Sequence, residues 1–148
     1  MLRREEIHKS KRKWKRGWHM NQLTKKRAKA ILIDTLLATG VSVVIESALR
    51  RKMDNEFFYV VVLPTLTLWG LEYAQIKTTG QTAGQKLMGI KVVSENSGEL
   101  NGEQILKRAA HRDFISTFTY LRHRQEYDVY NGSKFPHDVY AETAVIEK

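Results

Sequence analysis

The chain contains no cysteine among its 148 residues, which excludes a disulfide-stapled fold and a thiol-dependent site. The first 27 residues lack the apolar segment of a cleavable signal peptide, so we expect none. None of the five histidines forms an H-x-x-x-H pair, and no other metal-ligand spacing occurs. No recognisable Ser/His/Asp or Cys/His motif is present either. We therefore expect no enzyme activity, no metal site and no cofactor.

Charge is scarce in two stretches of about 20 residues, 30–49 and 57–76, and about 20 helical residues cross the core of a bilayer. The first stretch carries only Asp34 and Glu46, and the second carries only Glu72 apart from its tyrosines. A soluble helix would show a polar face at a period of about 3.6 residues, for which the second stretch leaves no room. These features predict a transmembrane helical hairpin with spans at about 28–49 and 57–76.

A soluble helical protein with two unusually apolar core helices is the alternative, favoured by the mean hydropathy of −0.44 and the 28% of charged residues. The positive charges, however, are unevenly spread: twelve of the 25 Lys and Arg residues precede residue 30, and three lie in the 50–56 loop. Short segments rich in Lys and Arg stay on the cytoplasmic side. We therefore expect a multi-pass cell-membrane protein with both termini in the cytoplasm and the loop outside.

Residues 1–26 form a basic segment with interspersed aromatic side chains. Basic side chains attract anionic headgroups, and tryptophan settles at the membrane interface. A nucleic-acid-binding arm would have a similar composition. The position directly before a membrane helix favours lipid, so we expect anionic lipid and no nucleic acid as the partner. The predicted lipid-interface residues are Lys13, Trp14, Lys15, Arg16 and Trp18.

Three ionisable residues of the hairpin are candidates for a site. Arg27 and Asp34 are seven residues apart, about two helical turns, and so share a face. In an antiparallel hairpin, Glu72 lies at a similar depth to Asp34, and the two carboxylates would share a proton, a cation or an arginine, with Arg27 the nearest. An ion- or proton-binding carboxylate is one interpretation, and a structural ion pair or hydrogen-bond clamp is the other.

The segment after the hairpin has local signals of short elements. Thr82 and Gln85 fit a capping box that opens a short helix, and Gly89 fits its end. The glycine spacing is not that of a phosphate-binding loop. Residues 90–93 then predict a strand, with a turn at 95–98 behind it.

Residues 103–121 form an amphipathic pattern that is too polar to span a membrane. We expect a helix that lies at the membrane interface or packs on the hairpin. Its apolar face would consist of Leu106, Ala110, Phe114, Phe118 and Leu121.

Three motifs occur in order: R-A-K-A-I-L-I-D at 27–34, the G-Q-T-A-G-Q-K-L-M-G-I-K-V-V run at 80–93, and F-P-H-D-V-Y-A-E-T-A-V-I at 135–146. Together they resemble the RDD family of small bacterial membrane proteins over about residues 18–146. That family has an arginine at the start of its first helix, an aspartate within it and a second aspartate elsewhere. The resemblance assigns these places to Arg27, Asp34 and Asp138. Many members have a more apolar third helix than residues 103–121, which weakens the case for a third span.

The residues themselves leave two roles open for Asp138. It could cap the turn before a strand at 143–146, which could pair with residues 90–93. It could instead pair with Arg27 or another cation at the interface.

The expected fold is thus mainly α: a two-helix transmembrane hairpin, with a third amphipathic helix and a small β hairpin or sheet on the cytoplasmic side. The expected organisation is a juxtamembrane segment at 1–26 and an RDD-like domain at 27–146. Two short helices cannot enclose a pathway alone, so we expect a non-enzymatic regulatory or accessory subunit that binds another membrane protein. The alternative is cation, proton or small-solute transport by a homo-oligomer, with Asp34 as the ion-binding carboxylate and Glu72 as its neighbour.

Overall fold

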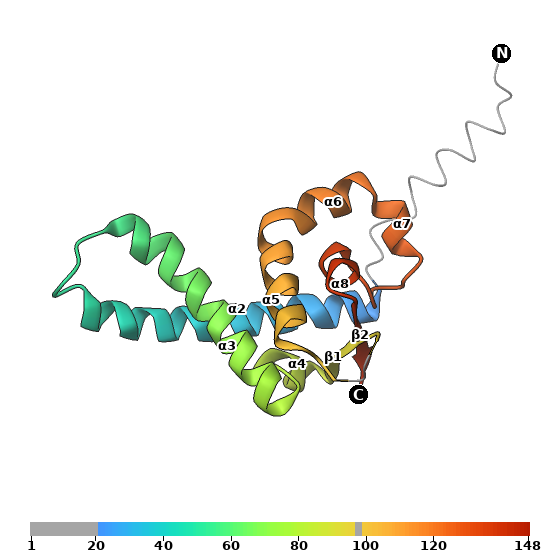
Figure 1. The fold of residues 1–148 in the computed structure, drawn as a ribbon, viewed down its shortest axis with the longest axis horizontal. Coiled ribbons are helices and arrows are strands. Elements are labelled where there is room, and N and C mark those ends of the chain that lie inside the picture. Colours follow the sequence, from blue (N-terminus) through green and yellow to red (C-terminus); the bar gives the residue numbers. More distant parts are fainter. Residues whose placement is uncertain (1–20, 97–98) are drawn as a thin grey trace, which may run out of the picture.

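The first element of the structure, a computed structural model that describes residues 21–96 and 99–148, is the long helix α2, Gln22–Leu49 (Figure 1). The side chain of Asn21 caps it by accepting a hydrogen bond from the backbone N–H of Leu23. The helix therefore begins several residues before the predicted span. The predicted lipid-interface residues Lys13, Trp14, Lys15, Arg16 and Trp18 lie outside the described residues.

The second apolar stretch is helical in two consecutive pieces, the π-helical turn η1, Phe58–Val62, and α3, Leu63–Thr79. Pro64 has no N–H and therefore cannot make the α-helical hydrogen bond at this point. The wider turn precedes it, with the N–H of Leu63 donating to the carbonyl of Phe58. Among the described residues, only α2 is long and apolar enough to cross a membrane, so a hairpin of two spans stays a prediction.

The local signals after the hairpin are confirmed. Helix α4, Ala83–Met88, begins with the reciprocal capping box of Thr82 and Gln85 and ends at Gly89, which adopts a left-handed conformation with φ of 64°. Strand β1, Ile90–Ser94, pairs antiparallel with β2, Thr143–Glu147. The predicted pairing is therefore right, but the strands are far apart in sequence, so they form a two-stranded sheet and not a hairpin. Part of the predicted turn, residues 97–98, lies outside the described residues.

The third helix is present as α5, Gly102–His111, the π-helical turn η2, Arg112–Ser116, and α6, Thr117–Arg122. Two short helices follow, α7, Arg124–Asp128, and α8, Pro136–Tyr140. Figure 1 shows α5 running across α2 rather than along it. Most of the predicted apolar face is exposed, and the buried face is the opposite one. The helix is therefore not packed on the hairpin by that face. The buried residues are Ile105, Arg108, Ala109 and Ser116.

A small apolar core lies where the first half of α2 packs against the sheet and α4. Ala30, Ile90, Val92 and Val145 form its buried cluster. A Cβ atom on Gly84 would lie 2.1 Å from the carbonyl oxygen of Ala30, so α4 contacts α2 backbone to backbone and requires glycine there. The second half of α2 instead exposes large apolar side chains, including Leu36 and Val44.

Candidate functional site

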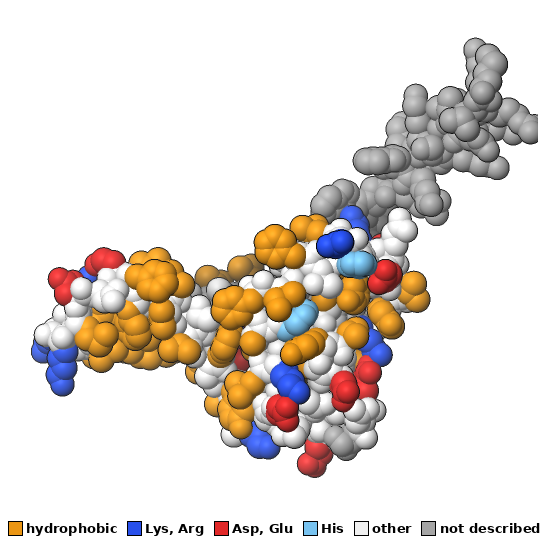
Figure 2. Space-filling view, turned by 45° about the horizontal axis from the view of Figure 1, so that its top comes forward, with side chains coloured by type: hydrophobic (Ala, Val, Ile, Leu, Met, Phe, Trp, Pro, Cys, Tyr) orange, Lys and Arg blue, Asp and Glu red, His pale blue; other side chains and the backbone are white. Residues whose placement is uncertain are grey.

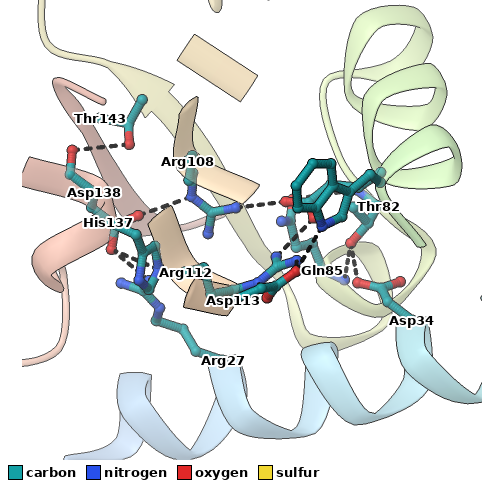
Figure 3. Close-up of polar contacts among 12 residues, drawn as sticks. Arg27, Asp34, Thr82, Gln85, Arg108, Arg112, Asp113, His137, Asp138 and Thr143 are labelled. Carbon is teal, nitrogen blue, oxygen red and sulfur yellow. Dashed lines mark hydrogen bonds and ion pairs between the residues drawn. The ribbon is translucent and has the colours of Figure 1, made fainter. Parts of the chain in front are cut away.

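Asp138 lies at the centre of a buried cluster of charged side chains. It sits in the first turn of α8 and is fully buried. One oxygen accepts from Nη2 of Arg27 at 2.5 Å and from the backbone N–H of Phe135 at 2.9 Å, and the other accepts from Nε of Arg108 at 2.9 Å. Asp138 thus caps α8 and forms two ion pairs, so both roles left open by the sequence are combined in one side chain (Figure 3).

Glu72 connects the cluster to α3. Its two oxygens accept from Nη1 of Arg108 at 2.8 Å and from Nη1 of Arg112 at 2.7 Å. Nε of Arg112 donates to Asp113 at 2.8 Å, and Asp113 also accepts from Nε1 of Trp69 at 2.7 Å. Three guanidinium groups thus meet three carboxylates, and their formal charges cancel. We call this set the buried ion network after its centre, since Asp113 at its edge is exposed; its members are Arg27, Glu72, Arg108, Arg112, Asp113 and Asp138.

Arg27 is held by backbone as well as by charge. Its Nη1 donates to the carbonyl oxygens of Gly132 at 3.0 Å and Ser133 at 3.2 Å. Its guanidinium lies over the ring of Phe135, 4.3 Å from the centroid. These contacts tie the N-terminal part of α2 to the segment before α8, more than 100 residues later in the sequence. Arg27 therefore joins the two ends of the domain.

Asp34 lies apart from the network and has a different task. One oxygen accepts from Oγ1 of Thr82 at 2.6 Å, and the other accepts from the backbone N–H of Gly84 at 2.8 Å. Asp34 and Glu72 therefore have different partners and do not share Arg27, which the sequence had suggested as their nearest counter-charge. Asp34 instead fixes the start of α4 against α2 (Figure 3).

The ring of His137 lies between Arg27 of the network and Ser116 at the end of η2. Its Nε2 is 3.0 Å from Nη2 of Arg27, and because arginine can only donate, Nε2 must accept and carries no proton. In the neutral ring Nδ1 then carries the proton and donates to Oγ of Ser116 at 2.8 Å. Burial lowers the pKa of His137 far below its usual value, and the nearby arginines lower it further, although Asp138 opposes them. His137 is therefore a neutral donor to Ser116.

The network also determines the charge state of two of its own members that lie outside α2 and α3, Asp138 and Arg112. Burial alone would raise the pKa of Asp138, but Arg27 and Arg108 outweigh burial and hold this pKa well below its usual range. Burial alone would lower the pKa of Arg112, but Glu72 and Asp113 outweigh it and raise this pKa above its usual value. Asp138 and Arg112 are thus both charged at neutral pH.

A cavity of about 30 Å³ lies between the network and Asp34, which is room for about one water molecule. Charged side chains from α2, α3 and α5 and apolar side chains from the sheet line it together. No group of three or more His, Asp or Glu side chains in the described part of the chain is arranged to hold a metal ion. The lining residues are Arg27, Ala30, Ile31, Asp34, Leu68, Glu72, Gln85, Ile90, Arg108, Arg112 and Val145.

The structure thus brings together three of the four candidate site residues, Arg27, Glu72 and Asp138, and places the fourth, Asp34 of α2, against the start of α4. Arg108 and Arg112 were not predicted as site residues, because in the sequence they are only polar residues that make the 103–121 segment too polar to span a membrane. Arg108 and Arg112 are four residues apart and share a helix face with the apolar Ile105. This spacing is the feature of the sequence that could have indicated one buried face. Trp69 and His137 carried no signal of their own, because both depend on partners distant in sequence.

Residues 23–122, more than half of the chain, match the model of the RDD family. The chain therefore belongs to the RDD family, as the resemblance had suggested. The motifs at 27–34 and 80–93 lie inside the match, and the motif at 135–146, with Asp138, lies outside it. This family is one of membrane-associated proteins, and the apolar helix α2 fits a place in a membrane. No curated protein and no solved structure matches the chain.

Proposed function

We propose that this RDD-family chain is a non-enzymatic membrane protein that acts as a regulatory or accessory subunit of another membrane protein. The observation that carries this proposal is that the carboxylates of the site already have partners within the chain. Both oxygens of Asp34, Glu72, Asp113 and Asp138 already accept hydrogen bonds. A cation that bound to Glu72 or Asp138 would have to break a buried ion pair, which costs several kcal/mol.

The size of the cavity supports the same proposal. A space for about one water molecule beside the network is far from a pathway across a bilayer. The network has the features of a structural clamp, since it connects α2, α3, α5 and α8 through paired charges. A rigid domain held in this way can present a fixed surface to a partner.

The proposed topology places α2 and the η1–α3 helix in the plasma membrane as two spans. Both termini would then be cytoplasmic and the 50–56 loop external, as the distribution of Lys and Arg favours. Arg50, at the start of the loop, pairs with Glu46 of α2 and with Glu56. Part of the positive charge of the loop is therefore neutralised within the chain.

The partner would dock against the groove between α2 and α3. This groove of about 260 Å³ is lined by small or threonine side chains at its α2 edge, and small residues permit close approach of a transmembrane helix. The lining residues are Thr35, Ala38, Thr39, Pro64, Thr65, Leu68 and Asp113.

The absence of enzyme activity is part of the proposal. Ser116, His137 and Asp138 lie close together like a hydrolytic triad, but the assigned tautomer makes the ring donate to Ser116. A ring that donates to the hydroxyl cannot remove its proton, so Ser116 is not activated. All three side chains are also buried away from any substrate.

Transport by a homo-oligomer remains the second candidate, and one observation favours it. The partners of Asp34 are a hydroxyl group and a backbone amide, both neutral, so its charge could be balanced by a cation or a proton. If Asp34→Asn leaves ion flux intact in a reconstituted oligomer, Asp34 is not the ion-binding residue.

Site-specific cross-linking in native membranes tests the accessory role, because the natural chain has no cysteine to interfere. A photo-crosslinker attached at Thr39→Cys, in the groove, should capture one stoichiometric membrane partner, identified by mass spectrometry. Val44→Cys, which is exposed on α2 and absent from the groove lining, is the matched control and should capture much less. A purely homo-oligomeric adduct, or ion movement by the purified chain alone in liposomes, would contradict the accessory role.

A further inference from the structure

The exposed apolar face of the third helix has no partner within the described part of the chain, apart from one ring contact. Phe114 is 67% exposed, Ile115 52% and Phe118 77%. Contiguous exposed apolar side chains of this size mark a protein or membrane interaction site. We propose that η2 and the start of α6 lie in the cytoplasmic membrane interface, with these three side chains inserted among the lipid acyl chains. This inference rests on the proposed insertion of α2 in the membrane.

The patch is continuous with the membrane hairpin. The Phe114 ring and Trp69 of α3 meet edge to face, with the centroids 6.1 Å apart and the planes at 88°. Nε1 of Trp69 donates to Asp113, so the indole has an apolar body and a polar end. A tryptophan side chain with an apolar body and a polar end settles at the level of the lipid headgroups. Figure 2 shows hydrophobic side chains continuing from the hairpin onto the neighbouring part of the globular body.

The direction of the helix fits the surface of a bilayer. Figure 1 shows α5 crossing α2, so a helix that follows α5 into η2 leaves the hairpin sideways. With α2 close to the membrane normal, α5 and η2 run along the membrane plane, and beyond its start α6 bends away from the hairpin (Figure 1). The inner face of α5 and η2 carries Arg108 and Arg112, which belong to the network, and Ser116, which binds His137. The apolar side chains are therefore left on the outer face, as in an interfacial helix.

The length of the hairpin is compatible with this placement if the hydrocarbon core ends near Asp34 and not at residue 28, the predicted start of the span. Beyond Asp34, the part of α2 up to Leu49 measures roughly 22 Å at 1.5 Å per residue, whereas the hydrocarbon core is about 30 Å thick. An interfacial helix is buried about 5–10 Å into the boundary between headgroups and acyl chains. Added to the hairpin, this depth gives about 27–32 Å, which matches the core. The boundary of the bilayer would then run along η2, with the buried ion network directly behind it.

Single-cysteine labelling tests this placement, because the natural chain has no cysteine. The variants Ile115→Cys and Phe118→Cys would each carry an NBD fluorophore, with the full chain reconstituted in phosphatidylcholine and phosphatidylglycerol vesicles. Glu103→Cys, at the exposed start of α5, is the aqueous control, and Val44→Cys is the control for the hydrocarbon core. The readouts are reduction by aqueous dithionite and quenching by nitroxide lipids labelled near the headgroup.

We expect reduction at Ile115→Cys and Phe118→Cys to be at least about tenfold slower than at Glu103→Cys, which corresponds to about 1.4 kcal/mol, together with strong quenching by the lipids. Equal rates at all three positions, with Val44→Cys protected, would overturn this inference and leave the membrane hairpin intact. Protection without lipid quenching would also overturn it, because a second copy of the chain would then cover the patch. Rapid reduction at Val44→Cys would refute the membrane insertion itself.

Discussion

Substitution of Gly84 by alanine should separate α4 from α2 and break the contacts of Asp34. The new Cβ atom would lie 2.1 Å from the carbonyl oxygen of Ala30 and 2.8 Å from its carbonyl carbon. Since real Cβ contacts stay above 3.0 Å, the two backbones must move apart by about 0.9 Å. Both hydrogen bonds that Asp34 accepts, from the backbone N–H of Gly84 at 2.8 Å and from Oγ1 of Thr82 at 2.6 Å, would then be stretched beyond normal length.

The cost follows from these bonds. A hydrogen bond to a charged group contributes about 1.5–3 kcal/mol, so the loss of two costs about 3–6 kcal/mol. Alanine is favoured over glycine in a helix by about 1 kcal/mol, which leaves a net loss of about 2–5 kcal/mol. The free energy of unfolding, measured by circular dichroism during denaturant titration in mixed micelles, should fall by this amount.

Two other glycines provide matched controls. A Cβ atom on Gly40 in α2 or on Gly70 in α3 would meet nothing within 4 Å. Gly40→Ala and Gly70→Ala should therefore leave the free energy of unfolding unchanged or raise it by up to about 1 kcal/mol. If Gly84→Ala behaves like these controls, α4 is not in backbone contact with α2, and the role assigned to Asp34 is wrong.

Two further predictions concern the buried ion network. Asp138→Asn should lower the free energy of unfolding by about 3–5 kcal/mol in the same titration, because the buried Arg27 loses its counter-charge and Arg108 keeps only Glu72. The exposed control Asp128→Asn should change it by less than about 0.5 kcal/mol, and equal effects would contradict the network. His137 has a pKa in the folded state far below its unfolded value of about 6.5, so the unfolded state takes up the extra proton and stability should fall as the pH drops below about 6.5, by up to about 1.4 kcal/mol per pH unit. His137→Gln should remove most of this slope, with His111, whose pKa burial also lowers, contributing the rest; an unchanged slope would show that His137 is not buried as a neutral ring.

Several elements could be predicted because their causes lie within a few residues. The capping box of Thr82 and Gln85 and the helix end at Gly89 depend on bonds that span three or four positions. The apolar surface of α2 could also be predicted, from composition alone, because apolar side chains avoid water without needing a specific partner. The start of α2 was placed too late, because the polar residues from Gln22 onward resemble a loop in sequence although Asn21 caps them as helix.

The partners of the charged residues could not be predicted, because burial and pairing over long distances in the chain decide them. Arg27 meets Asp138 only because α8 returns to α2, and Arg108 bridges Asp138 and Glu72 only because α5 crosses the same point. The sequence by itself determined the apolar hairpin segments, the local caps and the family motifs, all of which depend on neighbouring residues. The tertiary structure alone decided that Asp34 fixes α4, that Arg108 and Arg112 are buried, and that the apolar face of the third helix remains exposed. The physical reason is that a charge in a low-dielectric interior must find a partner in space, whatever its distance along the chain.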